Sequence, residues 1–247
     1  MIAGARRVAG ILAVVVVVWA AGCGPHAERE DARTSPPPAS PRTMPASNAP
    51  QPRIEPARAR PRIVFLGDSL TAGLGLAMSE SYPSLVQKRL DAAGLDFEVV
   101  NAGVSGDTSA GGLARLDWAL DGDVRILVVA LGGNDALRAL PADELRRNLG
   151  TIIERAQTRG ITVLLAGMEA PPNFGRDYIV SFHRVYPALA QQYHVAFVPF
   201  LLQGVAGSET LNQRDGIHPT AAGARILADT VWAALKPLAE GEKRSGS

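Results

Sequence analysis

Six consecutive apolar residues, at positions 126–131, constrain the fold of this chain more than any other feature. A strand that is apolar at every position is typical of a parallel sheet whose two faces are both covered. Shorter strand-like segments lie before and after it, at residues 63–66, 97–101, 161–166 and 196–199. Parallel strands need long crossover connections, which are usually helices. The alternation therefore predicts an α/β domain, a three-layer α/β/α sandwich with a five-stranded parallel sheet.

Two segments between and after these strands carry apolar residues at helical spacing. The first lies between Pro141 and Gly160, which are typical start and stop signals of a helix. The second begins near Thr220 and forms the last helix of the chain. The apolar stripes consist of Leu145, Leu149, Ile152, Ile153 and Ala156 in the first segment and of Ile226, Leu227, Val231 and Leu235 in the second.

The N-terminal segment has the composition of an export signal. Arg6 and Arg7 precede an almost wholly aliphatic run at residues 8–19, and small residues follow it. A basic head, an apolar middle and small residues at the cleavage site indicate a signal peptide, which we place at residues 1–22. The apolar run is shorter than the ~20 residues of a membrane span, and an uncleaved anchor helix is the alternative.

Cys23 is the only cysteine of the chain, and it follows Ala20, Ala21 and Gly22. This context resembles the lipobox of bacterial lipoproteins, with Ala20 where leucine is usual. The resemblance implies that Cys23 is lipidated and anchors the mature chain to a membrane of the cell envelope. An incidental cysteine in an ordinary cleavage region is the alternative. A single cysteine excludes a disulfide within the chain.

The composition changes sharply after Cys23. Ten of the 18 prolines lie between Gly24 and Pro61, with almost no large apolar residue among them. Such a stretch cannot bury enough surface to fold, so residues 23–61 are predicted to be a disordered tether. A disordered tail is predicted at residues 241–247, which leaves residues 62–240 as the folded domain.

The charge of the domain limits its partners. Residues 62–247 hold 17 Lys and Arg against 20 Asp and Glu, a net charge of −3, and no basic stripe. This balance argues against a nucleic-acid partner. It supports an uncharged substrate, and we expect a monomer.

Two distant segments offer the parts of a serine hydrolase. Ser69 follows the first predicted strand, at the end of the sheet where α/β proteins bind ligands. Asp215 and His218 are three residues apart, so one turn of chain can bring the carboxylate beside the imidazole. A hydroxyl, a base and an orienting acid are the groups needed for acyl transfer through serine. The alternative is that Asp68 and Ser69 merely cap the following turn.

The surroundings of Ser69 differ from the nucleophile elbow of α/β-hydrolases, because Thr71 occupies the position of the second glycine. Two more polar turns follow the second and third strands, at residues 101–108 and 132–135. Together with residues 215–219, these turns are predicted to converge with Ser69 at one edge of the sheet.

These segments resemble the four blocks of the GDSL, or SGNH, hydrolase family, over nearly all of residues 62–240. The similarity is greatest to the periplasmic multifunctional thioesterase, lysophospholipase and arylesterase branch, and it implies a flavodoxin-like sandwich. The family's functional residues match Ser69, Gly106, Asn134 and His218, with Asp215 as the triad acid. The resemblance implies a catalytic triad of Ser69, Asp215 and His218. It implies oxyanion donors from the backbone N–H groups of Ser69 and Gly106 and from the Asn134 amide.

The expected activity is hydrolysis of carboxylic esters through an acyl-serine intermediate, without metal or cofactor. By resemblance the substrates are aryl and acyl esters, lysophospholipids and thioesters. An exported enzyme rarely meets acyl-CoA, so lipid esters are favoured, with residues 136–140 and 169–176 as acyl-binding walls. One alternative is a carbohydrate O-acetyl esterase. Another is a non-catalytic envelope lipoprotein that keeps the fold for binding.

The remaining polar and aromatic candidates are interpreted as structural. Asp68, Asp107 and Asp135 are expected to shape their turns through hydrogen bonds. Asp215 and His218 lack a third metal ligand at recognisable spacing. Surface or packing roles are expected for His26, His183 and His194, and a core stripe for Phe174, Tyr178, Phe182 and Tyr186.

Overall fold

A computed structural model describes residues 60–245, so the predicted signal peptide, Cys23 and tether residues 23–59 lie outside the described residues. Five parallel strands form one sheet in the order β2-β1-β3-β4-β5. The predicted three-layer α/β fold is confirmed, and each predicted strand overlaps an observed one. The strands are β1 (Arg62–Gly67), β2 (Glu98–Gly103), β3 (Val124–Ala130), β4 (Thr162–Ala166) and β5 (Ala196–Val198).

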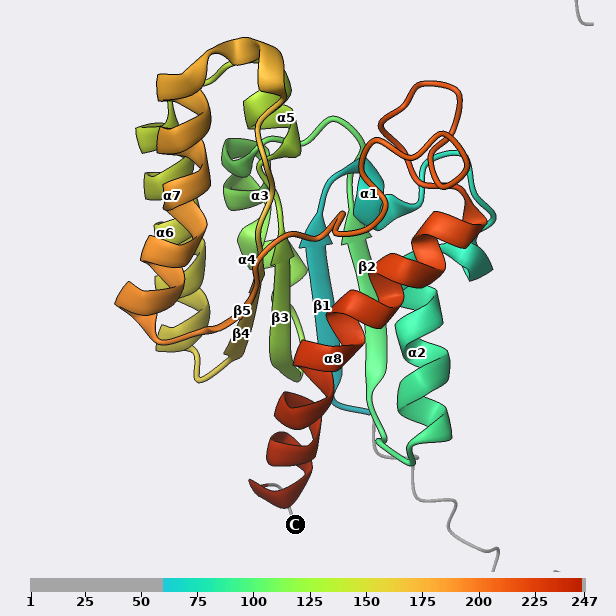
Figure 1. Cartoon of the computed structure of the whole chain (residues 1–247). Helices are drawn as coiled ribbons and strands as arrows, with labels where there is room; N and C mark the ends of the chain where they lie inside the picture. The colour runs from blue at the N-terminus through green and yellow to red at the C-terminus, as the bar shows by residue number, and fades with distance from the viewer. Residues whose placement is uncertain (1–59, 246–247) are drawn as a thin grey trace, which may run out of the picture. The chain divides into compact units, whose positions relative to one another are not determined.

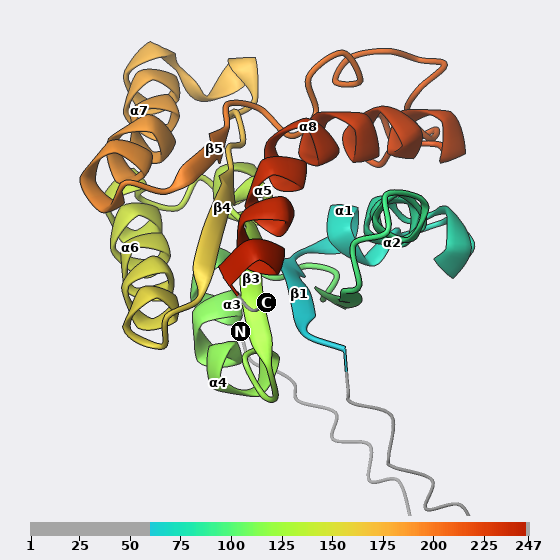
Figure 2. The same ribbon diagram turned by 90° about the horizontal axis from the view of Figure 1, so that it is seen from below.

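Helices cover both faces of this sheet (Figures 1 and 2). Figure 2 shows α2 (Tyr82–Ala92) and α8 (Ala221–Ser245) on one face. The other face carries α3 (Ser109–Ala114), α4 (Leu116–Ala119), α6 (Ala142–Thr158) and α7 (Arg176–Tyr193). Shorter elements lie in the connections, namely α1 (Ser69–Ala72), η1 (Met78–Glu80), α5 (Gly133–Leu137) and η2 (Pro172–Phe174). Within residues 60–245, no helix is long and apolar enough to cross a membrane.

Burial of the apolar strands and helix stripes explains this architecture. Residues 126–129 of β3 are completely buried, as expected for a strand covered on both faces. The five residues of the predicted stripe on α6 are also completely buried. On α8, Leu227, Val231 and Leu235 point into the same core. The hydrophobic pattern therefore determines which face of each helix packs on the sheet.

The domain begins slightly before the predicted boundary at residue 62. The Arg60 guanidinium forms ion pairs with Asp96 at 2.7 Å and with Asp91 at 2.9 Å. The Pro61 carbonyl accepts a hydrogen bond of 2.9 Å from the Glu98 amide, which extends the pairing of β1 with β2. These contacts attach the last two residues of the predicted tether to the domain.

The prediction of a disordered tail is wrong for residues 241–245, which continue α8. Thr162 Oγ1 donates a 2.7 Å hydrogen bond to Glu242, and Lys243 Nζ donates one of 2.9 Å to the Gly94 carbonyl. The basic residues Lys243 and Arg244 also lie in the last turn, where they interact favourably with the helix dipole. The end of the helix is thus held by polar contacts, which leave no hydrophobic pattern in the sequence.

Candidate active site

Ser69 is the first residue of α1, directly beyond the carboxyl end of β1. The turn requires glycine at position 67, because a Cβ there would lie 2.0 Å from Thr71 Oγ1 and 2.9 Å from the Ala130 carbonyl. Asp68 caps the helix, and its Oδ1 accepts a 3.0 Å hydrogen bond from the Leu70 amide. The capping interpretation therefore applies to Asp68, while the Ser69 hydroxyl is used elsewhere.

The Ser69 hydroxyl lies against the imidazole of His218, although 149 residues separate them. The distance from Ser69 Oγ to His218 Nε2 is 2.8 Å, and the distance from His218 Nδ1 to Asp215 Oδ2 is 2.6 Å. The structure thus brings the three predicted triad residues into one hydrogen-bonded row. In this arrangement the carboxylate fixes the ring so that Nε2 faces the hydroxyl.

Asp215 is held as a carboxylate by several donors. Hydrogen bonding to His218 lowers the pKa of Asp215 to about 2, and the backbone N–H groups of Ile217 and His218 add to the effect. These amides donate to Asp215 Oδ1 at 2.9 Å and 3.0 Å. One oxygen therefore organises the turn, and the other binds the imidazole.

The loop that carries His218 is attached to the end of α1 through Gln213. The Gln213 amide N–H donates to the His218 carbonyl at 2.7 Å. Its side-chain Nε2 donates to the Leu74 carbonyl at 2.7 Å and to the Pro219 carbonyl at 3.0 Å. These bonds set the position of the histidine loop relative to the segment that holds Ser69.

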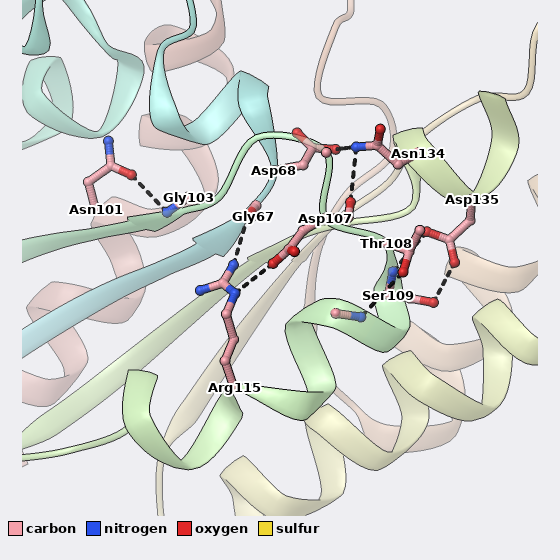
Figure 3. A network of polar contacts seen from close by, with 12 residues as sticks. Gly67, Asp68, Asn101, Gly103, Asp107, Thr108, Ser109, Arg115, Asn134 and Asp135 are labelled. Atoms are coloured by element: carbon pink, nitrogen blue, oxygen red, sulfur yellow. Dashed lines mark hydrogen bonds and ion pairs between the residues drawn. The ribbon is translucent and has the colours of Figure 1, made fainter. Parts of the chain in front are cut away.

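The three residues predicted to supply oxyanion donors line the same cavity. The backbone N–H groups of Ser69 and Gly106 donate to no other group within residues 60–245. Gly106 has φ +86°, a left-handed conformation that favours glycine. Asn134 Nδ2 donates hydrogen bonds to the Asp107 carbonyl at 2.9 Å and to Asp68 Oδ2 at 3.4 Å (Figure 3). The three predicted oxyanion donors therefore lie around one pocket with Ser69.

Buried carboxylates support these turns. Asp68 is 2% exposed, and its burial raises its pKa to about 6. The hydrogen bond from the Leu70 amide and the charge of His218 oppose this rise in the pKa of Asp68. The Asp135 carboxylate, also buried, accepts hydrogen bonds from the Ser109 amide at 2.8 Å and from the Ser109 hydroxyl at 2.5 Å. These contacts agree with the expected turn-shaping role of both aspartates.

A cavity of about 330 Å³ opens beside Ser69 and His218. Its volume lies within the usual range of small-molecule sites. Leu137 comes from one predicted wall, residues 136–140, and Glu169 and Pro171 come from the other, residues 169–176. The apolar residues not predicted from the sequence are Leu70, Leu74, Met168, Leu202 and Ile217. Leu70 lies in the short helix α1 and the others lie in loops, where single apolar residues show no periodic pattern.

The other candidates from the sequence lie away from the chemistry. His183 Nδ1 lies 2.7 Å from Glu169, and His194 ends α7 with φ +53°. Phe182 and Tyr186 are buried, as expected for a core stripe. Within residues 60–245, no group of three or more His, Cys, Asp or Glu residues could hold a metal ion. His26 lies outside the described residues.

The known proteins that this chain resembles agree with the geometry of the site. Residues 65–226 match the GDSL-like lipase/acylhydrolase family. Esterase TesA of Pseudomonas aeruginosa is 48% identical over 177 residues, which cover 71% of this chain and 88% of the relative. The thioesterase 1/protease 1/lysophospholipase L1 of Escherichia coli is 36% identical, with coverage of 74% and 86%.

A solved structure extends the similarity to the fold. The psychrotrophic esterase EstA from Pseudoalteromonas sp., inhibited by monoethylphosphonate, has 30% sequence identity and a TM-score of 0.68. The match covers 71% of this chain and 97% of that structure.

Proposed function

Because this chain belongs to the GDSL-like lipase/acylhydrolase family and is a carboxylic ester hydrolase, we propose that Ser69, His218 and Asp215 perform its chemistry. The observation that carries the proposal is the hydrogen-bonded row from the Ser69 hydroxyl through His218 to Asp215. The row borders an apolar cavity that has donor groups on its wall. Ser69 is proposed as the nucleophile, His218 as the general base and Asp215 as the acid that orients the imidazole.

The proposed reaction has two halves. Ser69 Oγ attacks the acyl carbon while its proton moves to His218 Nε2, and the former carbonyl oxygen becomes an oxyanion. The backbone N–H groups of Ser69 and Gly106 and the Asn134 amide donate hydrogen bonds to this oxygen. His218 then protonates the leaving alcohol, which departs from the acyl-serine. A water molecule releases the acid by the same steps, with His218 again accepting and returning the proton.

The proposed substrates are esters with a substantial apolar acyl group, including lysophospholipids. Leu74, Leu137 and Ile217 line the cavity and remain partly exposed, at 47%, 46% and 42%. An apolar wall that reaches the surface suits an acyl chain entering from a lipid aggregate. The name of the Escherichia coli relative includes both thioesterase and lysophospholipase activity. An exported enzyme meets lipid esters more often than acyl-CoA, which is chiefly cytoplasmic.

A series of p-nitrophenyl esters from acetyl to palmitoyl tests this substrate class. We expect kcat/KM to rise about fourfold for each methylene that enters the cavity, because each buried CH₂ contributes ~0.8 kcal/mol. Lysophosphatidylcholine and acyl-CoA assayed alongside distinguish lipid esters from thioesters. A preference for acetyl esters would support the carbohydrate O-acetyl esterase instead. Failure to cleave every ester would support the non-catalytic lipoprotein.

We further propose that the chain is an exported monomeric lipoprotein, anchored through Cys23 and residues 23–59. A lipid anchor would raise the local concentration of membrane-derived esters at the active site. In cells fed radiolabelled palmitate, the wild-type chain should become labelled and the Cys23→Ser variant should not. Ser69→Ala serves as the control, because it should abolish turnover while leaving the label in place. Equal labelling of the wild type and Cys23→Ser would contradict lipidation at this residue.

A further inference from the structure

Arg115 places a largely buried guanidinium close to the active-site edge of the sheet, although it contacts neither the cavity nor the triad. It lies between α3 and α4, and its side chain is 17% exposed. Its Nη2 donates a 2.9 Å hydrogen bond to the Gly67 carbonyl, and its Nε donates one of 2.6 Å to Asp107 Oδ2 (Figure 3). One planar group therefore joins the end of β1 to the loop that follows β2.

Both acceptors belong to segments that carry reacting groups. Gly67 lies two residues before Ser69, and its carbonyl also accepts a 3.0 Å hydrogen bond from the Val104 amide. Asp107 follows Gly106 directly, and its own carbonyl accepts the 2.9 Å hydrogen bond from Asn134 Nδ2. The Arg115 contacts thus connect the nucleophile segment with the two other proposed oxyanion donors, Gly106 and Asn134.

Stability alone is a weak explanation for this arrangement. Arg115 Nη1 is buried without a hydrogen-bond partner, and its charge is balanced by the single carboxylate of Asp107. Ion pairs removed from water are often no more stable than apolar residues of similar volume. A purely packing role would therefore be met at least as well by an apolar side chain.

Arg89 offers a comparison within the same chain. It pairs with Asp229 at 2.6 Å, is 26% exposed and also has an unpartnered buried Nη1. That pair joins α2 to α8, whose residues at this level carry none of the proposed reacting groups. The two arginines differ in the groups that they hold, and also in the burial of the carboxylate, since the Asp229 side chain is 69% exposed and that of Asp107 is 18% exposed.

We propose that Arg115 is a positioning residue of the oxyanion hole. This inference rests on the function proposed above. The guanidinium keeps the loop of Gly106 and Asp107 at a constant distance from the end of β1. The Gly106 amide and, through the Asp107 carbonyl, the Asn134 amide are thereby aimed at the oxygen of an acyl group on Ser69. Arginine suits this task because its rigid fork of N–H donors engages both acceptors at once, whereas a lysine ammonium is a single flexible point.

The substitution Arg115→Lys keeps the charge but removes the fork, and we expect it to lower kcat about 10- to 100-fold. The upper bound follows from the ~10²–10³-fold cost of losing an entire oxyanion donor. KM for a short p-nitrophenyl ester should change less than about threefold, because the ground-state ester makes little use of these donors. Arg89→Lys is the matched control. We expect it to change the melting temperature about as much as Arg115→Lys does and to leave kcat unchanged.

Coupling to Asn134 separates positioning from a general loss of structure. In an Asn134→Ala background, Arg115→Lys should reduce kcat by a clearly smaller factor than in the wild type, because part of what it positions is gone. Asp107→Asn, which keeps the carbonyl and weakens the ion pair, provides a second variant and should lower kcat in the same direction.

Three results would overturn the inference. The first is a kcat for Arg115→Lys within twofold of the wild type. The second is a double variant, Arg115→Lys with Asn134→Ala, whose loss of kcat equals the product of the two single losses. The third is an equal loss of kcat in Arg89→Lys. Ser69→Ala in the same assay keeps the two proposals apart. Turnover that survives Ser69→Ala contradicts the proposed function. An inactive Ser69→Ala beside a fully active Arg115→Lys contradicts only the role of Arg115.

Discussion

Replacing Ser69 with alanine is expected to lower kcat by about 10⁵-fold or more, since loss of a triad nucleophile has effects of this order. The hydroxyl lies 2.8 Å from His218 Nε2 and is the atom proposed to form the acyl bond. Alanine leaves the imidazole without a group to deprotonate. The helix cap belongs to Asp68 rather than to Ser69, so the fold should survive with a stability change of about 1 kcal/mol.

The measurement is kcat for a p-nitrophenyl ester, with circular dichroism to establish that the variant is folded. Ser181→Ala on α7 is the matched control, because this hydroxyl bonds only to the Tyr178 carbonyl and should be dispensable. Adding His218→Ala to Ser69→Ala should cause little further loss, since triad members act as a unit. A folded Ser69→Ala variant with kcat within tenfold of the wild type would show that another residue is the nucleophile.

The second large effect is expected for Asp215→Asn, with kcat reduced about 10⁴-fold, as for triads in general. The aspartate and asparagine side chains have nearly the same shape, and the asparagine oxygen can still accept hydrogen bonds from the Ile217 and His218 amides. Its NH₂ group would instead face His218 Nδ1, 2.6 Å away in the wild type. The imidazole would then carry its proton on Nε2 and could not accept one from Ser69.

Asp123→Asn is the control for Asp215→Asn, because the Asp123 carboxylate pairs with Arg125 at the surface. This control should retain wild-type kcat. A tenfold loss or less in Asp215→Asn would contradict the proposed role of the carboxylate. Nitrogen chemical shifts of the His218 ring, measured by NMR, should report the opposite neutral tautomer in the variant.

The low pKa of Asp215 also constrains the pH dependence. Its value of about 2 lies below the ordinary aspartate value, so the carboxylate stays ionised until the pH falls to about 2. Its contribution to stability is present above the unfolded pKa of about 4 and is lost as the pH falls through the folded value. Between neutral pH and pH 4 we therefore expect no step in kcat from Asp215.

The sequence predicted most of the fold because its strongest signals are local. The continuous apolar run at residues 126–131 and the five-residue stripe on α6 require burial on a defined face, whatever surrounds them. The two ends of the domain were placed less well. Arg60 and Lys243 are held by polar contacts to distant residues, and such contacts have no periodic signature.

The same distinction applies to the site. Ser69, Asp215 and His218 could be predicted to lie together because each is part of a recognisable turn motif, and parallel strands bring such turns to one edge of a sheet. Arg115 received no role because its two partners, Gly67 at the end of β1 and Asp107 in the loop after β2, are far from each other in the sequence. An arginine directly after the small residues of a short helix was the one available signal. The cavity residues Leu202 and Ile217 had no signal at all, since isolated loop residues meet only in three dimensions.

Covalent trapping tests the central claim most directly. The purified protein is incubated with a p-nitrophenyl alkylphosphonate, a reagent that transfers its phosphonyl group to an activated serine, and its peptides are analysed by mass spectrometry. We expect one adduct, on the peptide that contains Ser69, together with complete loss of ester hydrolysis. The Ser69→Ala variant should take up no label. An adduct on another residue with Ser69 unmodified, accompanied by the same loss of activity, would contradict the account.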